Sequence, residues 1–567
     1  MKPSACWTCR LRHKKCDESL PICGGCAALE IDCHYSSEKP QWMESEVRRR
    51  EATTRLKAQV KRSAKRRRGI AQMRSIASGI DVDPGPGPDP GRIEPSPDSS
   101  SKQTHSTSVV SSSEHTTLST AALTELEMGF ISVYMDYIFP ILFPFYRPYI
   151  TQGGRSWLLS LAMTNHGFMS SIITMSSLFL SFIPADLSVG HGSCTSRTWD
   201  ELQKQASDAL GSIQRDLQRL RERGVENSLS DSVHLLANMM QQLGFELAIM
   251  PSGNWQTHLD AATGLFEQIL EHHGKTGSTP QISAVLSNLS RPSWAADALN
   301  TEQGAFRFFS SILLIADIIS STVLNRRAKL STYHSELRRS GLRQQPSLDL
   351  EEITGCQAWV LLAISDISTL SRWKTDQMMS GELSRTELIS RASSIDEVLH
   401  KGLERIDRHG ERDQSSESSR PLESLLNQLG SPSGQPYDSS AGRLPLTRIW
   451  IHAARTYLLS VKLDGATKAS ELQTSVEQAT SSFGMVTSTP WLRWLAWPLC
   501  VTGVNASKEQ RPAVRGIIDS MCSLKAFGTI RSTFDIIEKV WQSQDAGKEY
   551  LNLSTCLSSL GYKTLLV

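Results

Sequence analysis

The chain has 567 residues, more than one hydrophobic core usually spans, so it should hold more than one folded unit. Its 39% hydrophobic and 21% charged residues exclude a wholly disordered, fibrous or collagen-like protein. The net charge of +2 averages two opposite parts, because residues 1–70 carry 17 basic and 8 acidic side chains and the remainder is net negative. The N-terminal part is therefore expected to bind a polyanion, which is nucleic acid or an anionic membrane surface.

The first element in chain order is a cysteine cluster, in which the spacing C-x2-C-x6-C occurs twice. Its members are Cys6, Cys9, Cys16, Cys23, Cys26 and Cys33. Intracellular thiols at CxxC spacing favour a metal over a disulfide, and tetrahedral zinc is the usual result. Because two tetrahedral zinc ions need eight sulfur contacts, six thiolates suffice only if two of them bridge. The internal symmetry assigns the bridges to Cys6 and Cys23.

The two halves of this cluster differ in charge. The gap between the second and third cysteines contains five basic or potentially basic side chains, whereas the corresponding gap of the second half contains none. The five are Arg10, Arg12, His13, Lys14 and Lys15. A short helix carrying such residues fits the major groove of DNA, where Arg and Lys bond guanine O6 and N7. The first half is predicted to read bases and the second half to support it.

These residues resemble the fungal binuclear zinc cluster of transcription regulators. The resemblance rests on Cys6-Trp-Thr-Cys-Arg-Leu-Arg-His-Lys-Lys-Cys16-Asp17, Pro21-Ile-Cys23-Gly-Gly-Cys26 and Cys33-His-Tyr35. It implies two Zn²⁺ ions, two short helices, a nuclear location and a first helix that reads a CGG-type triplet in double-stranded DNA. His13 departs from the family pattern, which most often has Lys or Arg there, so Arg12 or Lys14 is expected to share the reading.

A basic connector follows the cluster domain of residues 1–36 and extends over residues 37–76. Its densest part, residues 48–68, holds eleven Lys or Arg and one acid. Such a run fits nuclear localisation and phosphate contacts that weaken as salt rises. The residues expected to serve these roles are Arg48, Arg49, Arg50, Lys61, Arg62, Lys65, Arg66, Arg67 and Arg68. No sustained heptad follows, so monomeric binding and a homodimer formed through the large domain both stay open.

The remainder of the chain is divided by composition. Residues 77–117 contain 20 Ser, Pro and Gly and no aromatic residue, which predicts a disordered linker. Residues 118–545 show helical periodicity, with a polar loop at about 407–443, and residues 546–567 are expected to form a C-terminal tail. The fold class is therefore all-α. Residues 306–318 are apolar on nearly every side of a helix, which predicts a central helix with Asp317 as a buried, hydrogen-bonded carboxylate.

An uncharged run at residues 156–185 raises the question of a membrane span. A spanning helix needs about 20 predominantly apolar residues, and this run contains many polar ones. One or two helices buried in a globular domain are predicted instead, and no membrane partner is expected.

Several segments of the large domain resemble the regulatory domain of factors related to the fungal acriflavine-sensitivity regulator. They are residues 253–263, 355–359, 373–374, 447–458, 497–503 and 527–528. The resemblance implies a helical regulatory module that contacts the transcription machinery or co-regulators, and control of RNA polymerase II genes for a secondary metabolite or resistance. No GxGxxG, GxxxxGK[ST], HExxH or GxSxG motif occurs, so no enzyme is predicted. The alternative is a helical scaffold or small-molecule sensor whose zinc module does not read DNA.

Overall fold

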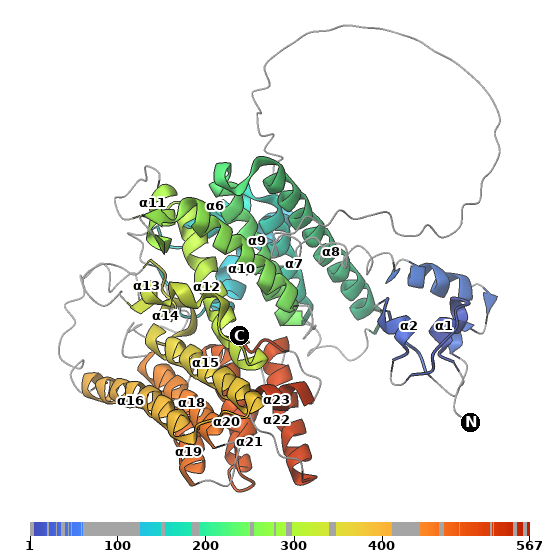
Figure 1. The fold of residues 1–567 in the computed structure, drawn as a ribbon. Helices are drawn as coiled ribbons and strands as arrows, with labels where there is room; N and C mark the ends of the chain where they lie inside the picture. Colours follow the sequence, from blue (N-terminus) through green and yellow to red (C-terminus); the bar gives the residue numbers. More distant parts are fainter. Residues whose placement is uncertain are drawn as a thin grey trace, which may run out of the picture.

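The computed structural model describes residues 5–60 and 125–567, except for 183–191, 250–254, 291–297, 339–346, 411–442, 464–469, 548–552, 560–563 and gaps of one to four residues. The predicted linker at 77–117, the basic residues from Lys61 to Arg68 and most of the predicted polar loop lie outside the described residues. Over the described ranges the chain is almost entirely helical (Figure 1). One two-residue antiparallel pair, β1 (Lys275–Thr276) with β2 (Thr279–Pro280), interrupts it. The all-α prediction is confirmed.

The N-terminal module, residues 5–60, contains the short helices α1 (Trp7–Leu11) and α2 (Gly24–Ala27). The first half of the large domain contains α4 (Glu125–Val133), a π-helical turn (Tyr134–Ile138), α5 (Phe139–Leu142), α6 (Ser156–Thr164), α7 (His166–Phe182), α8 (Gly192–Arg223), α9 (Leu229–Ile249), α10 (Trp255–His273), α11 (Ile282–Asn288), α12 (Thr301–Leu324) and α13 (His334–Arg338). The second half contains α14 (Glu351–Thr354), α15 (Ala358–Ser380), α16 (Arg385–Gly410), α18 (Leu444–Lys462), α19 (Ser470–Phe483), α20 (Ala496–Val504), α21 (Arg511–Ser520), α22 (Gly528–Asp545) and α23 (Leu553–Ser559).

Helix α12 lies at the centre of the large domain and packs against α6, α9, α10 and α15. A capping box fixes its start, in which Gln303 N donates to Asn300 Oδ1 at 2.8 Å and Asn300 N donates to Gln303 Oε1 at 3.3 Å. Asn325 ends it in the left-handed conformation, with φ of 47°. By length and composition α12 could span a membrane, but 83% of its most apolar window is buried against the rest of the domain. The predicted central helix is confirmed.

Asp317 is fully buried within α12 and ties this helix to the turn that follows it. The backbone N–H of Leu330 donates to Asp317 Oδ2 at 2.8 Å, and Arg326 Nη2 lies 3.5 Å from Oδ1. Burial raises the pKa of Asp317, although the Leu330 bond and the arginine oppose this effect. The predicted buried, hydrogen-bonded carboxylate is confirmed.

The uncharged run at 156–185 forms two helices, α6 and α7, instead of one long span. Asn165 separates them with an extended backbone, and its Oδ1 accepts the N–H of Phe168 at 3.1 Å in the first turn of α7. Asn238 of α9 donates to the same oxygen at 3.2 Å. The prediction of buried helices is confirmed.

The second half of the large domain packs α15 and α16 beside α18, and α18 beside α19 and α20 (Figure 1). At its centre the rings of Trp450 and Trp497 stack 5.6 Å apart, and Trp497 Nε1 donates to Thr322 Oγ1 of α12 at 2.9 Å. Leu565 and Leu566, near the end of the expected tail, are buried in the same core. The two halves of the large domain therefore share one hydrophobic core.

Candidate metal centre and nucleic-acid interface

The two short helices of the N-terminal module begin in the same way, each with a cysteine as its N-cap. Cys6 has φ and ψ of −66° and 147°, and Cys23 has −70° and 148°. Each sulfur accepts a backbone N–H three residues further on, from Cys9 at 3.2 Å and from Cys26 at 3.4 Å. These donors stabilise thiolate charge and orient both cysteines of each CxxC unit toward the same space.

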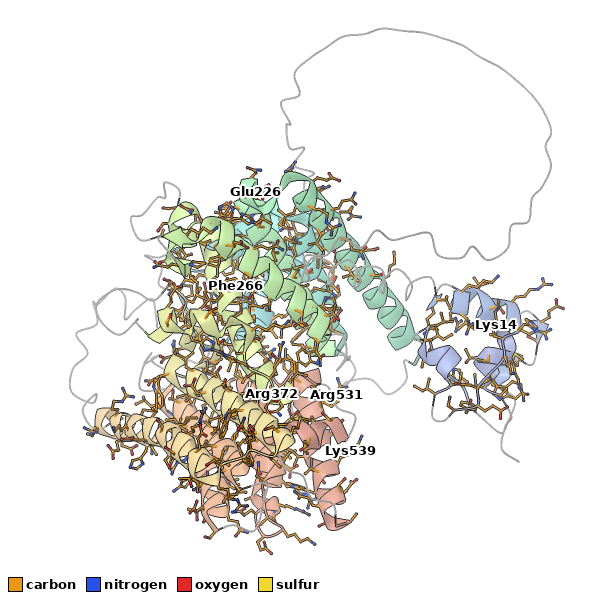
Figure 2. The ribbon with its side chains drawn as sticks, in the orientation of Figure 1. Lys14, Glu226, Phe266, Arg372, Arg531 and Lys539 are labelled. Carbon is orange, nitrogen blue, oxygen red and sulfur yellow. The ribbon has the colours of Figure 1, made fainter. Side chains whose placement is uncertain are left out.

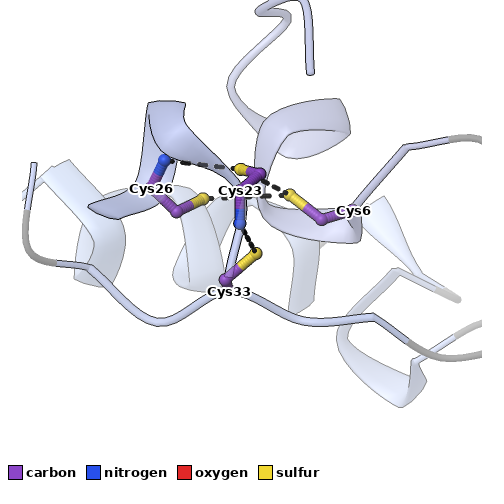
Figure 3. Close-up of side chains that lie close together, drawn as sticks. All are labelled: Cys6, Cys23, Cys26 and Cys33. Carbon is purple, nitrogen blue, oxygen red and sulfur yellow. Dashed lines mark hydrogen bonds between the residues drawn. The ribbon is translucent and has the colours of Figure 1, made fainter. Parts of the chain in front are cut away.

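The six cysteine sulfurs form two groups of four, within each of which the sulfurs lie no more than 4.8 Å apart. One group is Cys6, Cys9, Cys16 and Cys23, and the other is Cys6, Cys23, Cys26 and Cys33. Figure 3 shows the second group. Two sulfurs belong to both groups, those of Cys6 and Cys23, which lie 3.7 Å apart.

The spacing of these sulfurs fits zinc. A tetrahedral ion with Zn–S bonds of about 2.3 Å places its sulfurs about 3.8 Å apart. Cys6 and Cys26 lie 3.8 Å apart, and Cys9 and Cys23 lie 3.6 Å apart. All six are free thiols. The donor set and its spacing therefore fit a pair of zinc ions.

The close packing of the sulfurs also affects the ionisation of the thiols. Burial raises the pKa of Cys6 and of Cys26 far above that of an ordinary thiol. Burial acts on Cys23 in the same direction, but the backbone N–H of Cys26 and neighbouring thiols lower its pKa to about 6. Closely packed sulfurs cannot all be charged without compensation, and a coordinated dication supplies it by deprotonating its ligands.

Hydrogen bonds outside the cysteines hold the two halves together. Thr8 Oγ1 donates to the carbonyl of Asp32 at 2.8 Å and accepts the N–H of His34 at 3.2 Å. The hydroxyl of Tyr35 lies 3.3 Å from Cys16 Sγ, to which it can donate. Sequence reasoning missed Thr8 and Tyr35 as supporting residues. The signal was available for Thr8, because a hydroxyl between two metal-binding cysteines is buried and needs a partner.

The predicted base-reading residues gather at the end of α1, which we call the recognition turn (residues 10–15). Arg10 is exposed and lies 4.8 Å above the ring of Trp7. Arg12 is half-buried at the C-cap. His13, Lys14 and Lys15 are exposed, and Lys14 is labelled in Figure 2.

The recognition turn differs in one respect from the sequence-based expectation of a helix that carries all five basic residues. Helix α1 ends at Leu11, because His13 takes the left-handed conformation with φ of 54°. The N–H of Lys14 bonds instead to the carbonyl of Cys9 at 3.0 Å. His is among the residue types that tolerate this conformation, so the chain leaves the helix and presents the later basic residues from a turn.

A further helix, residues 46, 48–57 and 59–60, follows the cluster, and we call it the post-cluster helix. Leu56 and Val60 pack against the cluster of buried cysteines and Ile31. Gln59 Nε2 donates to Asp32 Oδ2 at 3.3 Å. Arg48, Arg49 and Arg50 are exposed on its first turn. The remaining predicted nuclear-localisation residues, Lys61 to Arg68, lie outside the described residues.

Two family models match the chain and together cover most of it. Residues 4–42 match the fungal Zn(2)-Cys(6) binuclear cluster domain, and residues 129–567 match the fungal specific transcription factor domain. No solved structure matches the chain. The first match assigns two zinc ions to the cysteine cluster, in agreement with its two groups of sulfurs.

Curated relatives match along nearly the whole length. The chain is similar to the transcription factor dibT of Pestalotiopsis microspora, at 31% identity over 100% of this chain and 99% of the relative. It is also similar to the pestheic acid cluster transcriptional regulator 3 of Pestalotiopsis fici, at 24% identity over 96% and 95%. The ustiloxin B cluster transcription factor ustR of Aspergillus flavus matches at 24% identity over 96% and 94%. The chain therefore belongs to the fungal transcription factors that join a Zn(2)-Cys(6) binuclear cluster to a fungal specific transcription factor domain, and it is a DNA-binding regulator, not an enzyme.

Proposed function

We propose that this regulator acts in the nucleus and reads a CGG-type triplet through its recognition turn. The observation that carries the proposal is the asymmetry of the module: the cation-rich turn projects from the first half, whereas the second half has no basic side chain between Cys26 and Cys33. Arg and Lys side chains bond the O6 and N7 atoms of guanine in the major groove. The proposed base-reading residues are Arg10, Arg12, His13, Lys14 and Lys15.

In this proposal the six cysteines would hold two zinc ions, with Cys6 and Cys23 as bridging ligands and Cys9, Cys16, Cys26 and Cys33 as terminal ones. The support is that the two bridging candidates alone belong to both groups of sulfurs. The zinc ions supply a rigid cross-link when bound. The chain's own residues then fix the geometry: Thr8 joins the halves, and the left-handed His13 directs the basic side chains outward.

Phosphate contacts are proposed for the basic residues after the cluster, with Arg48, Arg49 and Arg50 on the post-cluster helix and Lys61, Arg62, Lys65, Arg66, Arg67 and Arg68 beyond it. Such contacts supply affinity that does not depend on sequence, and they position the base-reading residues. The same run serves nuclear import in this proposal. Co-regulators would bind the large helical domain.

The genes that we propose as targets belong to a secondary-metabolite cluster. The support is that curated relatives carry names of cluster regulators, for pestheic acid and for ustiloxin B. Genome-wide mapping of sites bound by the protein tests this. Binding upstream of a contiguous set of biosynthetic genes is expected, and binding confined to unrelated genes would contradict it.

Base reading is tested with purified, zinc-loaded protein on a duplex that contains the triplet and on a scrambled duplex. Arg12→Gln should lower affinity for the first duplex more than for the second, and the loss of one good base contact corresponds to about 1–3 kcal/mol of discrimination. An equal loss of affinity for both duplexes would show that Arg12 does not read bases. Wild-type protein that holds zinc but binds neither duplex would favour the scaffold alternative.

A further inference from the structure

A groove lies between the recognition turn and the post-cluster helix, with a volume of about 940 Å³. Arg10, Arg12 and His13 line one wall. The opposite wall is the face of the helix that includes residues 49, 50, 53 and 57. The groove is therefore continuous with the residues proposed to read bases.

The charges of this groove are dominated by cations without partners. Its one acidic lining residue, Glu46, pairs with Arg50 at 2.6 Å. Within the described part of the chain, Arg12, Arg49 and Lys57 have no hydrogen-bond or ion-pair partner for their side chains. Three uncompensated cations that line one groove repel each other, and this repulsion is relieved by a polyanion that enters it.

The second wall is held in place by contacts away from its charges. Leu56 and Val60 pack on the cysteine cluster, and Gln59 donates to Asp32 of the second half. Arg49 and Lys57 lie on the groove-lining face of this helix, whereas Arg55 of the same helix is exposed and does not line the groove. The packing of the helix therefore separates cations that line the groove from cations that do not, and the sequence alone does not show this difference.

We propose that this groove holds one phosphodiester strand of the target duplex, with Arg49 and Lys57 on its phosphates while the recognition turn reads the adjacent bases. The inference rests on the proposed function and deepens it by assigning one face of the post-cluster helix to the DNA backbone. The charge of the groove and its continuity with the base-reading residues select this occupant. Phosphate contacts on the wall opposite the recognition turn would fix which bases the turn can reach.

The test measures the affinity of the full-length, zinc-loaded protein for a CGG-containing duplex and a scrambled duplex across a series of salt concentrations. Log affinity falls linearly with log salt concentration, and each lost phosphate contact makes this slope shallower by about 0.9. Arg49→Gln and Lys57→Gln should each produce this change and weaken binding to both duplexes alike. Arg55→Gln removes the same charge from the same helix outside the groove, and it should change the slope by less than half as much.

A second variant separates the position of the charges from their number. Leu56→Ala keeps every charge but weakens the packing of the helix, so it should reduce duplex affinity and the salt slope while native mass spectrometry still finds two zinc ions. Equal salt slopes for Arg49→Gln and Arg55→Gln, or an unchanged salt slope for Leu56→Ala, would overturn the proposal that this groove holds the DNA backbone. Tighter binding by the groove variants would also overturn it, because an acidic segment of the chain would then be the occupant. Failure of the proposed function looks different, since the wild-type protein would itself not distinguish the two duplexes.

Discussion

The carboxylate of Asp17 binds the backbone N–H of Gly24 through both oxygens, at 3.0 and 2.9 Å. Asp17 follows the last cysteine of the first half, and Gly24 is the first residue of α2, so the bond fixes the second half relative to the first. The hydroxyl of Ser19 donates to Asp17 Oδ2 at 2.8 Å, and this bond and that from Gly24 keep the pKa of Asp17 below its usual value. The carboxylate thus remains charged and accepts the first N–H of α2, beside the N-cap Cys23.

This bond makes two adjacent glycines unequal. A Cβ at Gly24 would lie 2.6 Å from Asp17 Oδ2, whereas a Cβ at Gly25 would lie 3.8 Å from Cys9 Sγ, which is ordinary contact. Gly24→Ala should displace the carboxylate and speed zinc release to a chelator about fivefold, which corresponds to the loss of a charge-assisted hydrogen bond worth about 1 kcal/mol at a helix start. Gly25→Ala should release zinc at close to the wild-type rate. A chromogenic chelator measures both rates, and the same rate in both variants would show that the Asp17 bond does not secure the metal.

The shared sulfurs predict unequal zinc losses among cysteine variants. Cys16 belongs to one group of four sulfurs and Cys6 to both. Cys16→Ser should therefore retain about one zinc ion per chain and Cys6→Ser none, since its loss leaves each ion with three ligands. Cys500→Ala, in the core of the large domain, should retain two. Native mass spectrometry counts the ions, and equal losses from Cys6→Ser and Cys16→Ser would argue against bridging by Cys6.

The contact between α15 and α16 depends on a glycine. A Cβ at Gly402 would lie 2.0 Å from the ring of Trp359, which is fixed by its 2.7 Å bond to Gln357 and by the guanidinium of Arg405 above it. Gly402→Ala should destabilise the large domain by about 1–3 kcal/mol, as overpacking does. Gly516→Ala, in α21, should stabilise it by about 0.5–1 kcal/mol, because a Cβ there would meet nothing within 4 Å apart from the backbone of its own helix. Thermal unfolding measures both, and equal midpoints for the two variants would contradict the contact.

His452 should make the large domain sensitive to acid. The residue is 7% exposed, and burial, with the charges of Arg455 and Arg448, lowers its pKa to about 4 despite the opposing charge of Asp407. Between pH 6.5 and 4 the unfolded chain binds a proton that the folded chain does not, so stability falls as pH falls through this range. The full loss is on the order of 3 kcal/mol.

Replacing this histidine separates its effect from general acid denaturation. His452→Gln should show a smaller decrease in unfolding midpoint between pH 7 and pH 4.5 than the wild type. His400→Gln is the matched control, because His400 is exposed on α16. A decrease in the His452→Gln midpoint as large as in the wild type would show that His452 does not titrate across this range.

The sequence predicted those features that depend on local spacing. A CxxC unit places two sulfurs one helical turn apart, so the cysteine cluster could be predicted without coordinates, and continuous apolar residues identified α12 as central. The sequence could not predict which surfaces pack against each other. Leu56 and Val60 lack a heptad and therefore gave no signal, although they dock the post-cluster helix. The end of α1 at Leu11 depends on the backbone of His13, which residue type alone does not specify.

The docked post-cluster helix limits how two copies of this protein can be joined. While Leu56 and Val60 lie against the cysteine cluster, they cannot form an apolar seam with a second copy. A dimer must then be held by residues other than these two. The separation and relative orientation of paired operator triplets would then not be set by a coiled coil through these two residues.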